Sequence, residues 1–308
     1  MRIQILDYQV GPHTFRMVKP SDFNIFKALP SLIPFITTID TTQKVIFETE
    51  IDDDETATKR TIAKTPDDIC FNWEDADCII RPLPHSSHLV SITPRKSGKN
   101  YWMECNDNFR QCFIHLPACR TETPAPENET NFVLNNFLMM LYAFNAARHH
   151  TLLMHASVVA TATGKGYIFL GKSGTGKSTH TGLWLQQFSD CHLLNDDNPI
   201  VHVDSLGKQA TVFGSPWSGK TPCYRKESMT VGAFVRLEQA PQNEIEQERA
   251  AHAFATLLPS CSCLKQNKEI YNAIVTTVTE LATLAPVYHL KCLPDREATE
   301  LCRKAVEG

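Results

Sequence analysis

The sequence predicts an α/β protein with a β-rich amino-terminal domain over residues 1–125 and an α/β domain over residues 126–308. Three observations lead to this prediction. Short runs of apolar residues, several of them alternating, follow one another up to about Cys119. The segment from Thr121 to Asn131, with two prolines and several acids, is typical of a linker. Beyond it, a short apolar run, a glycine-rich loop and a helical stretch follow in direct succession around Gly171.

The amino-terminal domain is expected to consist mainly of strands. Its extended runs are residues 3–5, 45–47, 78–80, 89–92, 101–105 and 109–114. The acidic run at residues 52–55 looks like a set of metal ligands, but four adjacent acids in regular structure cannot all point at one ion. We therefore expect a solvated loop there. No chemistry is indicated by this half of the chain.

A helix and a strand are expected after the linker. Residues 132–150 carry a broad apolar face at helical spacing. His149 and His150 close this helix, at the C-terminus, where the helix dipole favours positive charge. Residues 154–159 then form an expected strand. A lone histidine such as His155 is more often a core or edge residue than a catalytic one. It becomes a candidate because of the motif that it precedes.

That motif is GKSGTGKST, residues 171–179, which fits the phosphate-loop pattern G-x-x-x-x-G-K-[ST]. The apolar residues 166–170 before it predict a strand, and residues 177–188 after it predict a helix. Glycines allow successive backbone N–H groups to point into one concavity, and the helix terminus adds partial positive charge. The loop is therefore expected to hold a polyphosphate, with Lys177 on the terminal phosphates and Ser178 supplying a hydroxyl to Mg²⁺. The residues expected to bind the nucleotide are Gly171, Lys172, Ser173, Gly174, Thr175, Gly176, Lys177, Ser178 and Thr179.

Two acids close the next apolar run, Leu193 to Asp197. Adjacent carboxylates at a strand end point in different directions, so one can serve a metal while the other faces the substrate. Lys177 and Asp196 are only 19 residues apart, which leaves room for one helix and one return strand.

A second stretch, residues 214–221, matches the same loop pattern. In this stretch Pro216 removes a backbone N–H, Trp217 adds bulk where a phosphate would approach, and Pro222 disfavours a helical Thr221. We interpret it as a loop. Whether Lys220 or Trp217 faces the active site, or Trp217 simply packs, is left open.

The rest of the chain is expected to cover the sheet. Strands are expected at residues 210–213, 231–238 and 287–292, and helices at residues 245–258, 268–284 and 295–306.

Composition excludes several classes of protein. The chain has 308 residues, 42% of them hydrophobic, which is enough for two ordinary cores. A net charge of −4 gives no reason to expect nucleic acid as a partner. No membrane association is expected. A cytoplasmic location is expected, because the first residues lack the apolar core of a signal peptide. The 11 cysteines are scattered, so reduced thiols are expected.

At this point the chain resembles a known group. The order His-Ala-Ser-Val-Val, GKSGTGKST, short helix, and apolar strand ending Asp196-Asp197 is similar to the catalytic domain of HPr serine kinase/phosphorylase and, more distantly, phosphoenolpyruvate carboxykinase. The resemblance covers about residues 150–240, and residues 214–222 and 234–240 resemble uncharacterised bacterial HPr-kinase-like proteins. It implies a P-loop kinase domain of the HPr kinase/phosphoenolpyruvate carboxykinase type.

The resemblance also implies roles for individual residues. Lys177 is the phosphate lysine, Ser178 a magnesium ligand and Asp197 the second metal ligand. Asp196 is the catalytic base, oriented by His155, although the order of the two aspartates is left open.

A positive charge is needed beside the transferring phosphoryl group. Arg225 is the candidate for this positive charge, and Arg236 is the alternative. It is left open whether Arg225 is only an exposed surface residue. Thr179 stands where the HPr kinase loop usually carries an acid, so the acceptor need not be HPr.

The function expected is that of an ATP- and Mg²⁺-dependent kinase that transfers the γ-phosphoryl group to a hydroxyl, on a protein serine or on a small molecule. The alternatives are a nucleotide-binding sensor or scaffold, simple hydrolysis, and a carboxykinase-like enzyme. The expected partners are a nucleotide and a hydroxyl-bearing acceptor, and self-association into a homo-oligomer is left open.

Overall fold

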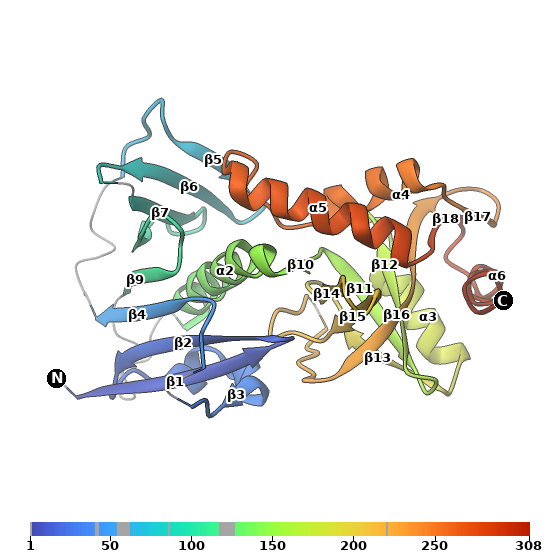
Figure 1. The fold of residues 1–308 in the computed structure, drawn as a ribbon, viewed down its shortest axis with the longest axis horizontal. Coiled ribbons are helices and arrows are strands. Elements are labelled where there is room, and N and C mark those ends of the chain that lie inside the picture. Colours follow the sequence, from blue (N-terminus) through green and yellow to red (C-terminus); the bar gives the residue numbers. More distant parts are fainter. Residues whose placement is uncertain (1, 41–42, 54–61, 86, 117–126, 220) are drawn as a thin grey trace. The chain divides into compact units, whose positions relative to one another are not determined.

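A computed structural model describes residues 2–40, 43–53, 62–85, 87–116, 127–219 and 221–308. The chain forms two compact units, Met1–Gln9 with His13–Asn145, and Val10–Pro12 with Ala146–Gly308. Each contains a large sheet, so the protein is of the mixed α/β class (Figure 1). The chain passes from the first unit to the second after Asn145, whereas the sequence predicted a domain boundary after residue 125.

The first unit is built on a nine-stranded sheet with the order β3-β1-β2-β4-β9-β8-β7-β6-β5. Its strands are β1 (Ile3–Val10), β2 (His13–Pro20), β3 (Ile36–Thr37), β4 (Glu48–Asp53), β5 (Ile69–Asn72), β6 (Ala76–Leu83), β7 (Ser87–Pro94), β8 (Tyr101–Cys105) and β9 (Gln111–Leu116). Two short helices, α1 (Ile25–Ala28) and the 3₁₀ helix η1 (Pro30–Phe35), lie between β2 and β3. Stacked rings of Tyr8, Phe15 and Phe47, with centroids 5.2 and 4.8 Å apart, fill part of its core. Asp52 and Asp53 of the acidic run belong to β4, and the rest of that run lies outside the described residues.

Helix α2 (Glu127–Ala146) begins earlier than the sequence analysis expected. The linker prediction is therefore wrong for residues 127–131, and residues 121–126 lie outside the described part of the chain. Contacts within the first unit account for the early start, because Thr130 is buried and Glu129 accepts a hydrogen bond from Ser97. The helix also ends before the expected His150, which has a left-handed φ of 50° after the 3₁₀ turn η3 (Ala147–His149).

The second unit contains a sheet with the order β10-β14-β15-β16-β12-β11-β13, extended by β18 beside β16 and β17 beside β18. Its strands are β10 (Thr151–Leu153), β11 (Ala156–Thr161), β12 (Lys165–Leu170), β13 (Cys191–Asn195), β14 (Ile200–Asp204), β15 (Gln209–Phe213), β16 (Ser228–Gln239), β17 (Glu244–Gln247) and β18 (Val287–Cys292). Strands β12, β16 and β18 run parallel. Their carboxyl ends meet at one edge of the sheet, which is where α/β proteins commonly bind ligands.

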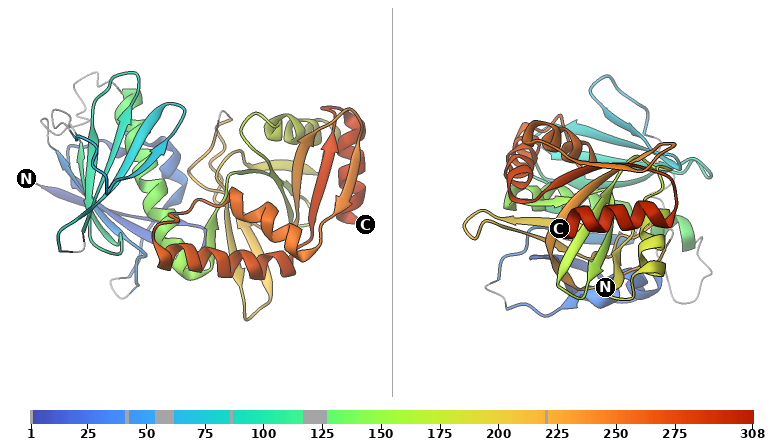
Figure 2. Two further views of the ribbon diagram at one scale, coloured as in Figure 1. Left: turned by 90° about the horizontal axis from the view of Figure 1, so that it is seen from above. Right: turned by 90° about the vertical axis from the view of Figure 1, so that its right-hand side faces the viewer.

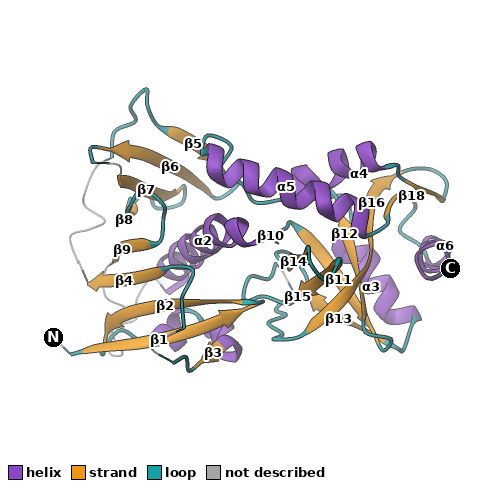
Figure 3. Ribbon diagram, in the orientation of Figure 1, coloured by secondary structure: helices purple, strands orange, loops and turns teal. Residues whose placement is uncertain are grey.

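Helices cover the second sheet (Figure 3). They are α3 (Lys177–Gln187), α4 (Ala250–Leu257), the short η4 (Leu258–Ser260), α5 (Lys268–Leu284) and α6 (Arg296–Glu307). Helix α5 packs along β10, β14 and β15, whereas α6 packs against α3, β16 and β17. Figure 2 gives two further views, in which α5 runs along the sheet of this unit. No helix in the described residues is long and apolar enough to cross a membrane.

Helix α3 is fixed to the sheet by an aromatic cluster. The Trp184 side chain is fully buried, with its ring centroid 5.6 Å from that of Tyr167 and 5.5 Å from that of Phe169. Trp184 also donates a hydrogen bond from Nε1 to Nε2 of His180, at 3.1 Å. This packing fixes the position of the first residues of α3 relative to β12.

The predicted helix at residues 245–258 is partly wrong. Residues 244–247 form strand β17, which pairs with the edge strand β18, and the helix begins only at Ala250. Ile245 is the only apolar residue between Gln242 and Arg249, so the sequence has no period here that separates strand from helix, and pairing with β18 decides between them.

His180 is expected to make the stability of the second unit depend on pH. Burial lowers the pKa of His180 to about 4, from its ordinary value of 6.5. The unfolded chain therefore binds this proton first, so stability should fall as the pH falls from 6.5 toward 4, by about 3 kcal/mol from this group.

Urea unfolding between pH 7 and 4 measures this loss. His180→Gln keeps an acceptor for Trp184 and does not titrate, so this variant should lose about 3 kcal/mol less than the wild type over the same range. Equal losses in the two proteins would contradict the assignment.

Candidate functional site

The glycine-rich loop joins the carboxyl end of β12 to the first residue of α3. Gly171, Gly174 and Gly176 have φ values of 155°, 80° and 105°, which side chains rarely tolerate. Thr175 closes a turn inside the loop, because its N–H and its hydroxyl both donate to the carbonyl of Lys172. The loop thus has the strand-loop-helix context that the sequence predicted, with the helix starting at Lys177.

His155 lies in a break between two strands. Of the expected strand 154–159, only residues 156–159 belong to a strand, β11, and Met154 forms an isolated bridge with Cys261. The His155 N–H donates to the carbonyl of Ser260 at 2.7 Å, and the N–H of Ala156 donates to the carbonyl of Asp197 at 2.9 Å. This interruption of the strand holds His155 at the end of the sheet beside the loop.

Three side chains form a continuous polar chain. His155 Nδ1 lies 3.0 Å from Asp197 Oδ1, and His155 Nε2 lies 2.9 Å from Lys177 Nζ. A lysine ammonium can only donate, so Nε2 accepts and Nδ1 carries the proton that is donated to the carboxylate. His155 is therefore assigned as the neutral Nδ1–H tautomer.

Lys177 is the most constrained member of this chain. Only 8% of the residue is exposed, and its ammonium also donates to the carbonyls of Gly171, at 2.8 Å, and Lys172, at 3.4 Å. Burial lowers the pKa of Lys177, while the negative charges of Asp197 and Asp196 oppose that shift. Both acids are thus close enough to the lysine to act on its charge.

The two acids have different environments. Asp196 is 6% exposed, and its Oδ1 accepts a hydrogen bond from the hydroxyl of Ser157 at 3.0 Å. Its Oδ2 is buried without a hydrogen-bond partner among the described residues. The Asp197 side chain is 32% exposed, and its Oδ2 accepts a hydrogen bond from Asn198. Asp197 is therefore the more accessible of the two.

Asn195 fixes the backbone at Asp197. Its Oδ1 accepts from the N–H groups of Asp197, at 2.9 Å, and Asn198, at 2.8 Å. Its Nδ2 donates to the hydroxyl of Ser215 and to the carbonyl of Trp217. Asn195 thereby ties the acid pair to the second glycine-containing stretch.

That second stretch packs behind the acids rather than starting a helix, as expected. Trp217 is 1% exposed, so of the two roles left open for it, packing is the one found. A Cβ added at Gly219 would lie 3.0 Å from the carbonyl oxygen of Asp196. Lys220 lies outside the described residues.

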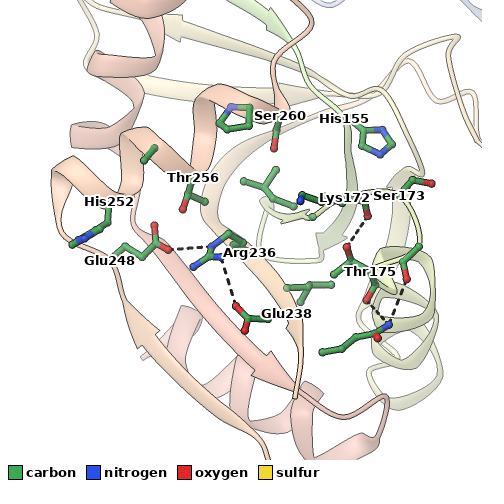
Figure 4. Close-up of a pocket in the computed structure, with 17 residues that line it drawn as sticks. His155, Lys172, Ser173, Thr175, Arg236, Glu238, Glu248, His252, Thr256 and Ser260 are labelled. Carbon is green, nitrogen blue, oxygen red and sulfur yellow. Dashed lines mark hydrogen bonds and ion pairs between the residues drawn. The ribbon is translucent and has the colours of Figure 1, made fainter. Parts of the chain in front are cut away.

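A pocket of about 880 Å³ opens beside the loop (Figure 4). The glycine-rich loop and His155 form one wall, the end of β16 a second, and Glu248 with α4 and η4 a third. Asp196, Asp197 and Ser178 are not among the residues that line it, and Asp197 is connected to it through His155. Lining the pocket are His155, Leu170, Gly171, Lys172, Ser173, Gly174, Thr175, Arg236, Leu237, Glu238, Gln239, Glu248, His252, Ala255, Thr256, Pro259 and Ser260.

The two candidate arginines differ in position. Arg225 does not line this pocket, and its guanidinium donates to Glu227 at 3.2 Å. Arg236 does line it, from the carboxyl end of β16, beside Glu248 and Glu238. The geometry thus favours Arg236, the rival in the sequence analysis, over Arg225.

Sequence reasoning missed Ser157, Asn195 and Glu248 as site residues. Ser157 lies in the expected strand after His155, and Asn195 directly precedes the acids, so proximity to the motifs is a signal that could have found both. Glu248 fell within a segment expected to be helical, and nothing local marked it.

Comparison of the chain with models of known protein families gives no match, and a search of curated proteins gives none either. In the described part of the chain, no group of three or more His, Cys, Asp or Glu side chains could hold a metal ion. Magnesium at phosphate sites commonly takes one or two protein ligands, with phosphate and water oxygens as the others.

Proposed function

We propose that this protein is an ATP- and Mg²⁺-dependent kinase that transfers the γ-phosphoryl group to a hydroxyl. The observation that carries the proposal is the Asp197–His155–Lys177 chain, which joins a candidate base directly to the lysine of a phosphate-binding loop. In this proposal the second unit is a P-loop kinase domain of the HPr kinase/phosphoenolpyruvate carboxykinase type, as the motif order suggested.

Phosphate binding would be the task of the loop and Lys177. The positive φ angles at Gly174 and Gly176 allow a curved backbone ahead of α3, and the helix N-terminus favours an anion there. The Lys177 ammonium donates to two backbone carbonyls and to His155. Phosphate oxygens carry more negative charge than any of these three acceptors, so they would compete for the ammonium.

Transfer of Lys177 to a phosphate would free Nε2 of His155. With its proton on Nδ1 and its lone pair on Nε2, the imidazole could then take a proton from an acceptor hydroxyl. Asp197 would stabilise the imidazolium formed, through the 3.0 Å contact with Nδ1. A phosphate in the loop would therefore both present the group to be transferred and expose the base.

This arrangement reverses the expected order of the two aspartates. Asp197 is partly accessible and contacts His155, so it can support that histidine as the base, whereas Asp196 has a buried oxygen without a partner among the described residues. Such an orphaned carboxylate oxygen fits a divalent cation, so Asp196 with the Ser178 hydroxyl would hold Mg²⁺. When bound, Mg²⁺ would neutralise charge on the phosphates.

Arg236 would supply the remaining positive charge. It extends from the end of β16 into the pocket that His155 also lines. A guanidinium there can stabilise the charge that develops on the transferring group.

Nucleotide binding tests the choice between the two stretches that match the loop pattern. Lys177→Ala should abolish binding of MgATP in calorimetric titration, because it removes the cation that faces the phosphates. Lys220→Ala is the matched control and should bind as the wild type does. The opposite result would move the site to residues 214–221.

Transfer of labelled phosphate separates a kinase from its alternatives. Purified protein is incubated with γ-labelled ATP and candidate acceptors, both small alcohols and serine-containing proteins. Label on an acceptor is expected for the wild type, with a rate about 10²- to 10⁴-fold lower in Asp197→Asn and His155→Gln, because the base is lost. Both variants should still bind MgATP.

Two other results would contradict the kinase proposal. Release of free phosphate alone indicates hydrolysis, and binding with neither product indicates a sensor or scaffold. Leu206→Ala, at a residue that is 98% exposed, is the control and should leave the rate unchanged.

A further inference from the structure

The pocket wall that faces the glycine-rich loop contains a buried carboxylate with an unused oxygen. The Glu248 side chain is 7% exposed, and its Oε1 accepts a hydrogen bond from Nε of Arg236 at 3.4 Å. Its Oε2 is buried and has no hydrogen-bond partner in the described residues. A buried acceptor of this kind costs free energy unless a donor reaches it.

Glu248 is held firmly in this position. Its backbone N–H donates to the carbonyl of Val287 at 2.8 Å, at the start of β18. The next residue, Arg249, is the N-cap of α4. Figure 4 shows the carboxylate beside Arg236, with Thr256 and Ser260 along the wall between Glu248 and His155. Glu248 is therefore a fixed part of the pocket wall and not a loose surface chain, and its unused oxygen is covered in this structure.

The charges around Glu248 favour a cation. Glu248 and Glu238 both contact Arg236, at 3.4 and 3.7 Å, so two carboxylates share one guanidinium. Among these three side chains the carboxylates outnumber the guanidinium by one, while Glu238 also lies 2.8 Å from His289 Nε2 and Lys172 lines the opposite wall. If Arg236 turns toward a phosphoryl group, Glu248 also loses its only side-chain partner among the described residues.

The rest of the lining is consistent with a small polar ligand. A volume of about 880 Å³ lies within the range of small-molecule sites. Besides the charged groups, the wall opposite the loop offers the hydroxyls of Thr256 and Ser260. Among the described residues that line the pocket, none is a Phe, Tyr or Trp that would stack on a nucleobase.

We propose that Glu248 selects the phosphoryl acceptor, which is a small alcohol that also carries a protonated amine. The ammonium of the acceptor donates to Glu248 Oε2, while its hydroxyl lies at His155, which lines the same pocket. This inference rests on the proposed kinase function. In the transfer, the O–H bond of the acceptor breaks and its proton goes to His155 Nε2. A new O–P bond forms to the γ-phosphorus, and the bond to ADP breaks.

Pairs of acceptors matched in length provide the test. Amino alcohols with a terminal amine and two to six carbons, from ethanolamine to 6-amino-1-hexanol, are each compared with the diol of the same length in the presence of MgATP, because Thr256 and Ser260 lie between Glu248 and His155. The wild type should show a KM at least about tenfold lower for the amino alcohols long enough to reach both residues than for the matching diols, because only the amine pairs with the carboxylate.

Variants of Glu248 should remove this preference selectively. Glu248→Gln should raise the KM for the amino alcohols about tenfold or more, with little change in kcat and none in the KM for the diols. Glu248→Asp keeps the charge and should retain the preference. Glu246→Gln, at a neighbouring acid that does not line the pocket, is the matched control and should behave as the wild type.

A binding measurement keeps the inference testable without turnover. Saturation-transfer NMR should detect ethanolamine on the wild type in the presence of a non-hydrolysable ATP analogue, and should not detect it on Glu248→Gln. Binding without phosphoryl transfer would overturn the kinase proposal but leave standing the assignment of Glu248 as the carboxylate that binds the ammonium group. Transfer only to diols or to proteins, an equal KM within each pair, or an unchanged preference in Glu248→Gln would overturn the inference.

Discussion

The candidate site depends on which acceptor holds the ammonium of Lys177. Backbone carbonyls of the loop and the imidazole of His155 share this single buried cation, and a phosphate would compete with all of them. The nitrogen of His155 that faces the lysine is the one that would take the substrate proton. In the proposed mechanism base activity therefore requires phosphate binding, because a phosphate must first draw the lysine away from that nitrogen. In this proposal, binding and chemistry would thereby be coupled without movement of the backbone.

The fold supports this coupling by fixing both ends of the chain of side chains. Trp184 and His180 hold α3 against β12, so the first residue of the helix, Lys177, cannot shift far. At the other end, β11 pairs with β12 on one side and with β13 on the other. His155, which precedes β11, and the acids that follow β13 therefore meet at the same edge of the sheet. The parallel strand β16 brings Arg236 to that edge from the other side of β12.

The part of the site that could be predicted is the part that is local in the sequence. Strand, loop and helix around Lys177 are consecutive, and glycines at the positive φ angles mark them directly. The acid pair was found because it ends an apolar run. The other site residues are placed by pairing between strands that are distant in the sequence. The register that sets Val158 opposite Asn195 determines that His155 contacts Asp197 and that Ser157 contacts Asp196, and no local pattern encodes it. Glu248 was hidden for the same reason, since β17 owes its strand conformation to pairing with β18.

The imidazole nitrogens of His155 report most directly on the central claim, that a bound phosphate takes Lys177 away from this histidine. Two-bond ¹H–¹⁵N NMR spectra distinguish the two nitrogens, and they can be recorded during titration with a non-hydrolysable ATP analogue and Mg²⁺. The account predicts that Nδ1 stays protonated throughout, while the Nε2 resonance shifts in proportion to analogue bound, and that Lys177→Ala shows no such shift. An analogue that binds without changing the Nε2 resonance, or a His155 found doubly protonated at neutral pH, would contradict it.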